Sequence, residues 1–181
     1  MASAAPQPAP SGDAFDLLGL EPRFDLDPAR LERAYLSRAA RLHPDLASGN
    51  PDAPAKAAAL NHAKATLSDP EARANLLLAR LGGPAKDQDK SLPAGFLMDI
   101  LETRERAEAD LASADPARLA PWKSWTNDQR AAYAQRVSEL FAAALAQPHP
   151  DTLRAIRLEL NAWRYIERLA EQLDPARSAN L

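Results

Sequence analysis

His43, Asp45 and His62 are the side chains of this sequence whose types could support chemistry. Imidazole and carboxylate groups bind zinc, and a histidine paired with an aspartate also occurs in hydrolytic sites. Their spacing matches no common coordination motif, and no nucleophile is evident beside them. A metal enzyme is therefore the weakest hypothesis, and we predict neither a metal site nor a cofactor. The tripeptide His43-Pro44-Asp45 has to be interpreted from the elements around it.

The composition narrows the class of protein. Apolar residues make up 46% and charged residues 26% of the 181 residues, and good helix formers dominate, which favours an all-α fold. The absence of cysteine excludes disulfides, thiolate nucleophiles and iron–sulfur clusters held by this chain. The formal net charge of −3 argues against nucleic acid as a partner.

The sequence carries no evident targeting or membrane segment. No apolar run approaches the roughly 18 residues that a membrane span requires, so we expect no membrane partner. Residues 1–12 are rich in alanine, proline and serine, and they resemble neither a secretory signal nor a transit peptide. We therefore expect a disordered tail at 1–12 and a cytoplasmic protein.

Prolines and capping residues predict the helix boundaries of the first half. Asp27-Pro28 is an N-cap followed by proline at the first helical position. The helix that it starts should run to about Leu42, because the residue before Pro44 is disfavoured in the α region. The other predicted boundaries are a short helix capped by Ser11 or Asp13 and ending at Leu18, a loop over 44–54, a helix over 55–67, and a helix from Asp69-Pro70 to Gly82-Gly83.

The second half has three longer helical patterns, near 94–112, 127–146 and 150–173. Thr126 and Gln129 resemble a capping box for the middle helix, so residues 113–126 are expected to form a connection. The polar, aperiodic segment 83–93 is typical of a domain linker. The predicted organisation is a tail over 1–12, a first domain over 13–82, a linker over 83–93 and a three-helix domain over 94–181.

The helix predicted after Asp27 is amphipathic when it is projected at about 100° per residue. Its core-facing stripe consists of Leu31, Tyr35, Ala39 and Leu42. Its solvent side is predicted to carry Arg30, Arg33, Arg38 and Arg41. Such a cationic face either serves only to keep the protein soluble or steers an acidic partner toward the helix.

The order of these elements resembles the J-domain, a helical hairpin that stimulates the ATPase of DnaK-type chaperones. The resemblance rests on the opening Phe15-Asp16-Leu17-Leu18-Gly19-Leu20, the basic helix, the tripeptide at its end, and the helix that stops at Ser68-Asp69-Pro70. It implies that the tripeptide contacts the chaperone's ATPase domain and interdomain linker. The residues implied in chaperone binding are His43, Pro44 and Asp45, with steering by Arg30, Arg33, Arg38 and Arg41 and rim contributions from Lys56 and Lys64.

The helix predicted to begin near Phe96 carries more apolar surface than one core needs. One stripe contains Phe96, Ile100, Ala107 and Leu111, and a second, about 120° away, contains Leu97, Met98 and Leu101. A helix of a small bundle buries about one stripe, so the second is either covered by the linker or exposed as a binding surface. The last helix shows a similar excess, which packing on two neighbours would equally explain.

This half, with its segment Tyr165-Ile166-Glu167-Arg168-Leu169, resembles the HscB-type co-chaperones of iron–sulfur cluster assembly. The resemblance extends from Phe15 to about Leu173 and includes Arg73-Ala74-Asn75-Leu76-Leu77-Leu78. It implies that the C-terminal three-helix bundle binds a cluster scaffold protein and delivers it to a DnaK/HscA-type chaperone. The implied scaffold-binding residues are Leu97, Met98, Leu101 and Tyr165. We expect a monomer that catalyses no reaction.

Two departures from the family pattern affect the client side. Tyr165 stands where phenylalanine is familiar, so its hydroxyl needs a polar partner or water. Trp122 or Trp125, in the expected connection, could cover part of the apolar surface. The alternative hypothesis is a J-domain co-chaperone that delivers an unrelated client to a general DnaK-type chaperone.

Overall fold

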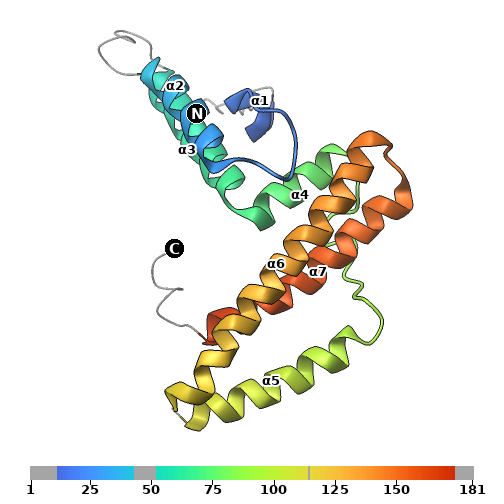
Figure 1. The fold of residues 1–181 in the computed structure, drawn as a ribbon. Coiled ribbons are helices and arrows are strands. Elements are labelled where there is room, and N and C mark those ends of the chain that lie inside the picture. The colour runs from blue at the N-terminus through green and yellow to red at the C-terminus, as the bar shows by residue number, and fades with distance from the viewer. Residues whose placement is uncertain (1–11, 43–51, 114, 174–181) are drawn as a thin grey trace, which may run out of the picture. The chain divides into compact units, whose positions relative to one another are not determined.

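The computed structural model describes residues 12–42, 52–113 and 115–173, so His43, Pro44 and Asp45 lie outside the described residues. Every regular element in these ranges is a helix, which confirms the all-α fold class (Figure 1). The chain divides into two compact units, Met1–Leu76 and Leu77–Leu181. Each unit has its own buried core.

The first unit is built on a helical hairpin. Helices α2 (Pro28–Ala40) and α3 (Ala53–Ser68) lie side by side, and the short helix α1 (Ala14–Leu18) packs against both (Figure 1). The buried side chains at their contacts include Phe15, Leu18, Leu31, Leu60 and Leu67. Full burial of each such side chain contributes about 1.5–3 kcal/mol, so this apolar contact holds the hairpin together.

Aspartates at the predicted positions start α1 and α2. Asp13 accepts hydrogen bonds from the amides of Phe15 (2.9 Å) and Asp16 (3.3 Å), and the Asp16 carboxylate accepts one from the Asp13 amide (3.2 Å). Asp27 accepts from the amide of Ala29 at 2.9 Å, which confirms the predicted start of α2. These caps, of which the Asp13–Asp16 pair is reciprocal, satisfy amides that have no partner within the helix.

Helix α4 (Pro70–Arg80) crosses the boundary between the units, and Asp69 caps it by accepting a hydrogen bond from the Ala72 amide at 3.1 Å. Arg73 anchors its first part within the first unit. One Arg73 nitrogen donates to the carbonyl of Leu67 at 2.5 Å, and the guanidinium lies 5.3 Å from the ring centre of Phe24. Burial lowers the pKa of Arg73 from its ordinary value, with nearby aspartates opposing the shift.

Two of the approximate boundaries predicted for this unit differ from the observed ones by two residues. Helix α3 begins at Ala53, before the predicted residue 55, because Pro54 fits within a first helical turn, where its missing N–H has no intrahelical partner to lose. Helix α2 ends at Ala40, and Arg41 and Leu42 continue only as a turn.

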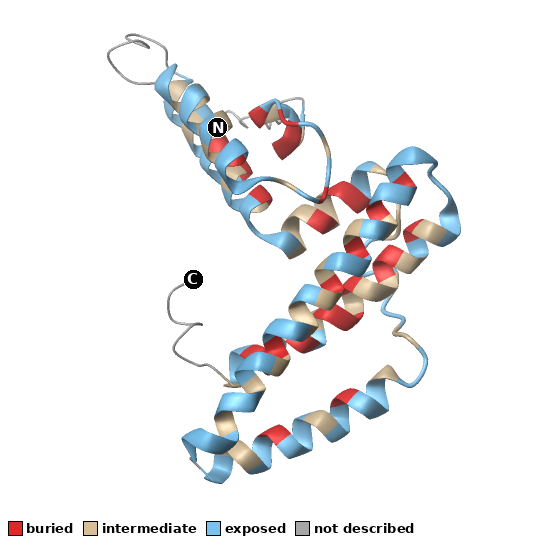
Figure 2. Ribbon diagram, viewed as in Figure 1, coloured by how far each residue is buried: buried red, intermediate tan, exposed pale blue. Residues whose placement is uncertain are grey.

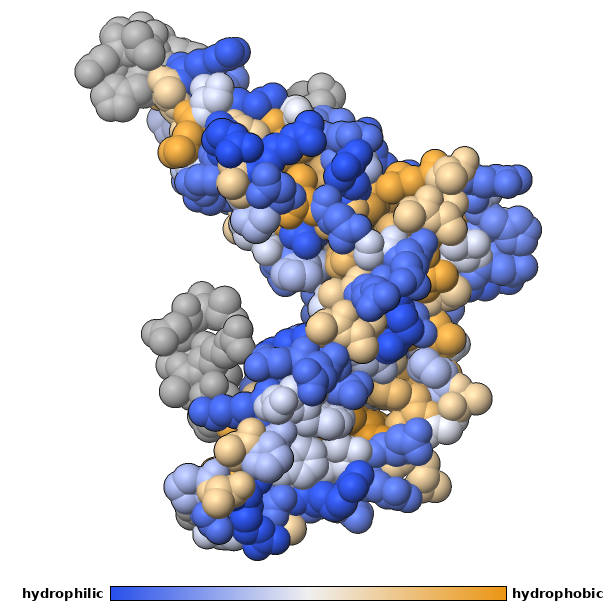
Figure 3. Space-filling view, in the orientation of Figure 1, coloured by the Kyte–Doolittle hydropathy of each residue, from blue (hydrophilic) through white to orange (hydrophobic). Residues whose placement is uncertain are grey.

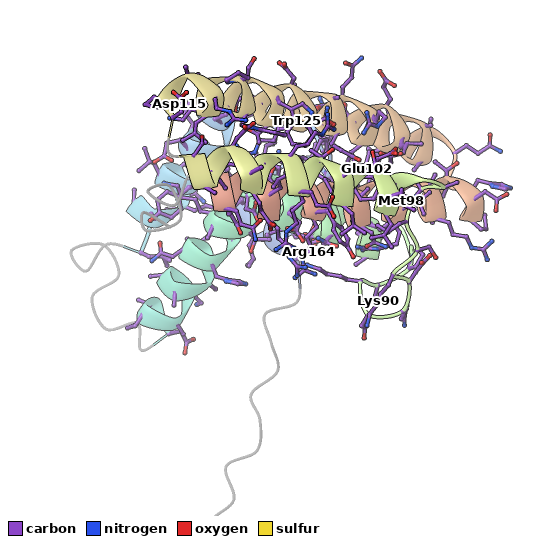
Figure 4. The ribbon with its side chains drawn as sticks, turned by 90° about the horizontal axis from the view of Figure 1, so that it is seen from below. Lys90, Met98, Glu102, Asp115, Trp125 and Arg164 are labelled. Atoms are coloured by element: carbon purple, nitrogen blue, oxygen red, sulfur yellow. The ribbon has the colours of Figure 1, made fainter. Side chains whose placement is uncertain are left out.

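The second unit contains α5 (Phe96–Ser113), α6 (Pro116–Ala146) and α7 (Pro150–Leu173). Helices α6 and α7 lie side by side in Figures 1 and 4, and their facing positions are buried in Figure 2. Their shared core includes Val137, Phe141, Ile156, Leu160 and Leu169. Helix α5 packs on both, but its buried residues in the described range are only Ile100 and Ala107. It is therefore the least embedded helix of this unit.

A part-buried ion pair joins α6 to α7. Nε and Nη2 of Arg130 donate to Oε1 and Oε2 of Glu167 at 2.9 and 2.6 Å, and the indole of Trp163 donates to Oε1 at 2.9 Å. The Trp163 ring also stacks on Tyr133 with a centroid separation of 6.4 Å. Burial raises the pKa of Tyr133, because it disfavours the phenolate.

The predicted connection over 113–126 was wrong, because Ser113 ends α5 and residues 116–126 form the first turns of α6. Asp115 caps this helix by accepting from the Ala117 amide at 2.9 Å, and Pro116 occupies the first helical position. Pro121 lies inside the helix, where it costs one backbone hydrogen bond. Thr126 therefore caps nothing, and its buried hydroxyl donates to the carbonyl of Lys123 at 3.0 Å.

Candidate protein-binding surfaces

The exposed side of α2 carries arginines. Arg30, Arg33 and Arg41 are exposed, and Arg33 lies 3.9 Å from Asp27, at the long end of an ion pair. Within the described ranges, neither Arg30 nor Arg41 forms an ion pair. Leu36 is also exposed on this helix. Figure 3 shows mainly hydrophilic side chains over the visible face of this unit. The surface is therefore cationic, with one apolar side chain among the charges.

Arg38 does not share this solvent face, so that part of the prediction was wrong. Its side chain is half-buried, one nitrogen donates to the carbonyl of Ala34 at 3.4 Å, and the guanidinium lies against Gly19. Arg38 follows the buried Leu31 by seven residues, which is close to two helical turns. It therefore projects beside the core stripe and toward α1.

The lysines assigned to the rim have partners within the hairpin. Lys64 lies 2.7 Å from a carboxylate oxygen of Glu32 and 4.4 Å from the ring centre of Tyr35. The Tyr35 hydroxyl donates to Asn61 at 2.8 Å. Lys56 lies 3.8 Å from Asp52 in an exposed pair. Lys64 thus joins α2 to α3 in addition to carrying charge.

The part of the chain that the structure describes contains no group of three or more His, Cys, Asp or Glu side chains arranged to hold a metal ion. His62 is exposed on α3, and its proposed companions His43 and Asp45 fall outside this part. No helix in the same ranges has the length and hydropathy needed to cross a membrane.

The second unit exposes apolar side chains on α5 and α7. Leu97, Met98 and Leu101 of α5 are 50%, 66% and 48% exposed, and Tyr165 of α7 is 37% exposed. These four residues are called the apolar patch below. The other stripe of α5 supplies the buried Ile100 and Ala107. The sequence left open whether the linker covers this stripe of α5 or the stripe is exposed. The stripe is exposed, so the linker does not cover it.

An aromatic contact connects the α5 and α7 parts of the patch. The ring of Phe96, at the start of α5, meets the ring of Tyr165 edge-on, with centroids 5.8 Å apart and planes 77° apart. This arrangement is favourable for aromatic quadrupoles. It places Leu97 and Met98 directly after a residue that is held against α7.

Neither tryptophan of α6 covers the patch, contrary to the possibility raised by the sequence. The indole of Trp122 donates to Asp110 at 2.9 Å, Arg118 pairs with the same carboxylate at 2.9 Å, and Trp125 packs edge-on against Trp122. Asp110 follows Leu101 by nine residues, or about 14 Å of helix. Trp122 and Arg118 therefore fasten the C-terminal end of α5, and these bonds lie away from the patch at its N-terminal end.

The predicted linker is partly fastened to α7. We call residues 84–91 the strap. Nε of the buried Arg157 donates to the carbonyl of Pro84 at 3.0 Å, and the amide of Asn161 donates to the carbonyls of Asp89 and Ser91 at 2.9 and 3.0 Å. Hydrogen bonds from Ser91 lower the pKa of Asp89. The sequence interpretation missed both α7 residues, although an arginine beside an apolar stripe signals a buried acceptor.

Comparisons with known proteins agree with the resemblance found in the sequence. Residues 13–76 match the DnaJ domain family, and residues 92–174 match the family described as the HSCB C-terminal oligomerisation domain. The co-chaperone protein HscB homolog of Bordetella pertussis is 32% identical over 170 residues, which cover 91% of this chain and 95% of the relative. The homolog of Vibrio cholerae is 30% identical over 166 residues, covering 88% and 97%.

Solved structures give the same result. Chaperone HscB from Vibrio cholerae superposes with a TM-score of 0.73 at 26% identity, covering 94% of this chain and 100% of that chain. Human co-chaperone protein HscB has a TM-score of 0.73 at 24% identity, covering 94% and 84%, which supports the fold alone. These relatives bear the name of co-chaperones. The chain therefore belongs to the HscB family and is a J-domain co-chaperone of iron–sulfur cluster assembly.

Proposed function

We propose that this chain binds an iron–sulfur cluster scaffold protein through the apolar patch and stimulates the ATPase of a DnaK/HscA-type chaperone through its first unit. The observation that carries the proposal is the exposure of Leu97, Met98, Leu101 and Tyr165 in a chain of this family. The chain would act as a monomeric, cytoplasmic adaptor, without a cofactor and without bond chemistry of its own.

The patch has the chemistry of a binding hot spot. Leu97 and Leu101 are one turn apart on α5, and Met98 between them has a side chain that adapts to irregular partner surfaces. Within the described residues, the Tyr165 hydroxyl has no hydrogen-bond partner. It is therefore available to a polar group of the partner or to water. A partner that covers these side chains removes apolar area from water, which drives association.

The chaperone side would use charge and the tripeptide together. Arg30, Arg33 and Arg41 present cations that can steer encounter with an acidic surface, whereas Arg38 lies against Gly19 at the end of α1. The roles of His43, Pro44 and Asp45 rest on the J-domain match over residues 13–76. A modest, transient interface is sufficient for such an encounter.

Scaffold binding is tested by calorimetry with wild type and the triple variant Leu97→Ala/Met98→Ala/Leu101→Ala. The variant should lose roughly 2 kcal/mol or more, which is about 30-fold in Kd. Leu145→Ala is the matched control, because Leu145 is a leucine of the same unit that is 41% exposed but lies on α6. Equal scaffold affinity of wild type and the triple variant would refute the assignment of the patch.

The chaperone half is tested by a single-turnover ATPase assay with Asp45→Asn. Stimulation should be abolished while the helical circular dichroism spectrum and the unfolding midpoint stay as in wild type. Asp52→Asn removes a nearby exposed carboxylate and should stimulate normally. Retained stimulation by Asp45→Asn would overturn the role of the tripeptide. Stimulation without any scaffold binding by wild type would favour the alternative of an unrelated client.

A further inference from the structure

Three residues on one face of α7 contact the strap and the first residue of α5. Arg157, Asn161 and Tyr165 follow each other at intervals of four residues, which places them in one row along the helix. Their partners ascend in the same order: Pro84, then Asp89 and Ser91, then Phe96. The strap and the first turn of α5 are thus fastened along a single row that ends in the apolar patch.

The first two residues of this row, Arg157 and Asn161, donate hydrogen bonds to backbone carbonyls of the strap. Arg157 is 2% exposed, and a guanidinium at that depth requires acceptors, so the Pro84 carbonyl satisfies part of a strong requirement. Asn161 uses its amide group to bridge two carbonyls on either side of Lys90. Lys90 itself is exposed. Figure 4 shows the strap around Lys90 leading directly into the first turn of α5, which carries Met98.

The strap connects to the patch through a short, defined turn. The Phe96 amide donates to the carbonyl of Pro93 at 3.1 Å, and the Met98 amide donates to that of Gly95 at 3.1 Å. Gly95 has φ of 79°, a conformation that glycine adopts at little cost and other residues do not. The direction in which α5 leaves the strap, and with it the placement of Leu97 and Met98, is set by this turn.

Helix α5 has little else to hold its first half. Between Phe96 and Leu101 the only buried residue is Ile100, and the polar contacts of Trp122 and Arg118 lie at the far end of the helix. Release of the strap would therefore loosen the residues that a client must contact. A loosened surface costs affinity, because the partner must then order it on binding.

We propose that Asn161 and Arg157 are positioning residues for the apolar patch, and that docking of the strap on α7 and binding of the scaffold at the patch stabilise each other. This inference rests on the proposed function, since it concerns how the scaffold site is held. By linkage, scaffold binding tightens the strap by the same factor by which strap docking raises scaffold affinity.

The test removes the Asn161 contacts without touching the patch. Asn161→Asp keeps the shape of the side chain but has no N–H to donate, and Asn161→Ala is the second variant. Both should weaken scaffold binding by roughly 5- to 30-fold. In hydrogen exchange, amides 85–91 should lose protection in both free variants. In wild type, saturating scaffold should raise the protection of these amides by the factor by which the variants weaken binding.

Arg136→Ala is the matched control. It removes a polar contact of α7 with α6, the 3.0 Å bond from Arg136 to Glu159, and leaves the strap alone. Its scaffold Kd should stay within about twofold of wild type. If the Asn161 variants lose amide protection in the strap but bind the scaffold with unchanged affinity, the inference is overturned and the proposed function stands.

Two further outcomes would contradict the proposed coupling between strap docking and scaffold binding. A strap that stays protected in both Asn161 variants would show that Asn161 does not fasten it. Weaker binding without added strap protection in scaffold-bound wild type would make Asn161 a direct contact. Either result overturns the coupling. Failure of wild type to bind the scaffold would overturn the coupling and the proposed function together.

Discussion

The guanidinium of Arg38 lies directly against Gly19, the residue that ends α1 in a left-handed conformation with φ of 54°. A side chain at residue 19 would occupy the space that Arg38 fills. This contact links the basic helix α2 to the C-terminal end of α1. One arginine of a charged helix thus belongs to the packing of the J-domain.

Gly19→Ala should destabilise the first unit for two reasons. The left-handed backbone costs about 1–2 kcal/mol for a residue with a Cβ, and Arg38 must move. Gly82→Ala is the control, because Gly82 has φ of 77° and nothing within 4 Å of the added atom. Urea unfolding should show a larger loss for Gly19→Ala. Equal losses would mean that displacing Arg38 has no energetic consequence.

Arg130→Ala should destabilise the second unit by roughly 1.5–3 kcal/mol, because it leaves the part-buried Glu167 without its charged partner. Thermal unfolding of wild type and variant measures this. Arg154→Ala is the control, since its 3.5 Å pair with Asp151 is exposed and should be worth about 0–1 kcal/mol. The double variant Arg130→Ala/Glu167→Gln should regain most of the lost unfolding free energy. Additive effects in this double-mutant cycle would contradict a direct interaction.

Arg30→Glu/Arg33→Glu should slow association with the chaperone about tenfold at low salt, because the steering field of α2 is reversed. The difference should shrink near 1 M salt, where the Debye length is about 3 Å. Stopped-flow association rates provide the measurement. Arg104→Glu/Arg106→Glu makes the same charge change on α5 and should have little effect. A salt-independent defect would indicate a direct contact instead of steering.

Tyr165→Phe should bind the scaffold within about threefold of wild type, because the edge-on contact with Phe96 and the apolar area are kept. Tyr165→Ala should lose about tenfold or more in scaffold affinity, as expected for an aromatic hot spot that the partner covers on binding. Calorimetric Kd values separate the two. A large loss for Tyr165→Phe would show that the hydroxyl binds a polar group of the client.

The sequence alone was sufficient for features that depend on neighbours within a turn or two. The caps at Asp13, Asp27 and Asp69 were predictable because a carboxylate reaches the amides of the next few residues. The apolar stripe that buries Ile100 followed from helical periodicity in the same way. The motifs of both halves were also sufficient to predict the family.

Tertiary structure decided the features whose partners are distant in the chain. Pro121 is accommodated within α6, whose first turns are tied to α5 through the bonds of Arg118 and Trp122 to Asp110, and no local signal predicted those bonds. Arg157 and Asn161 donate to backbone carbonyls that are 70 or more residues away. Every residue has a backbone carbonyl, so the residue pattern does not identify which ones are bonded. Local hydrogen bonds are encoded by spacing, whereas these contacts exist only once the helices have packed.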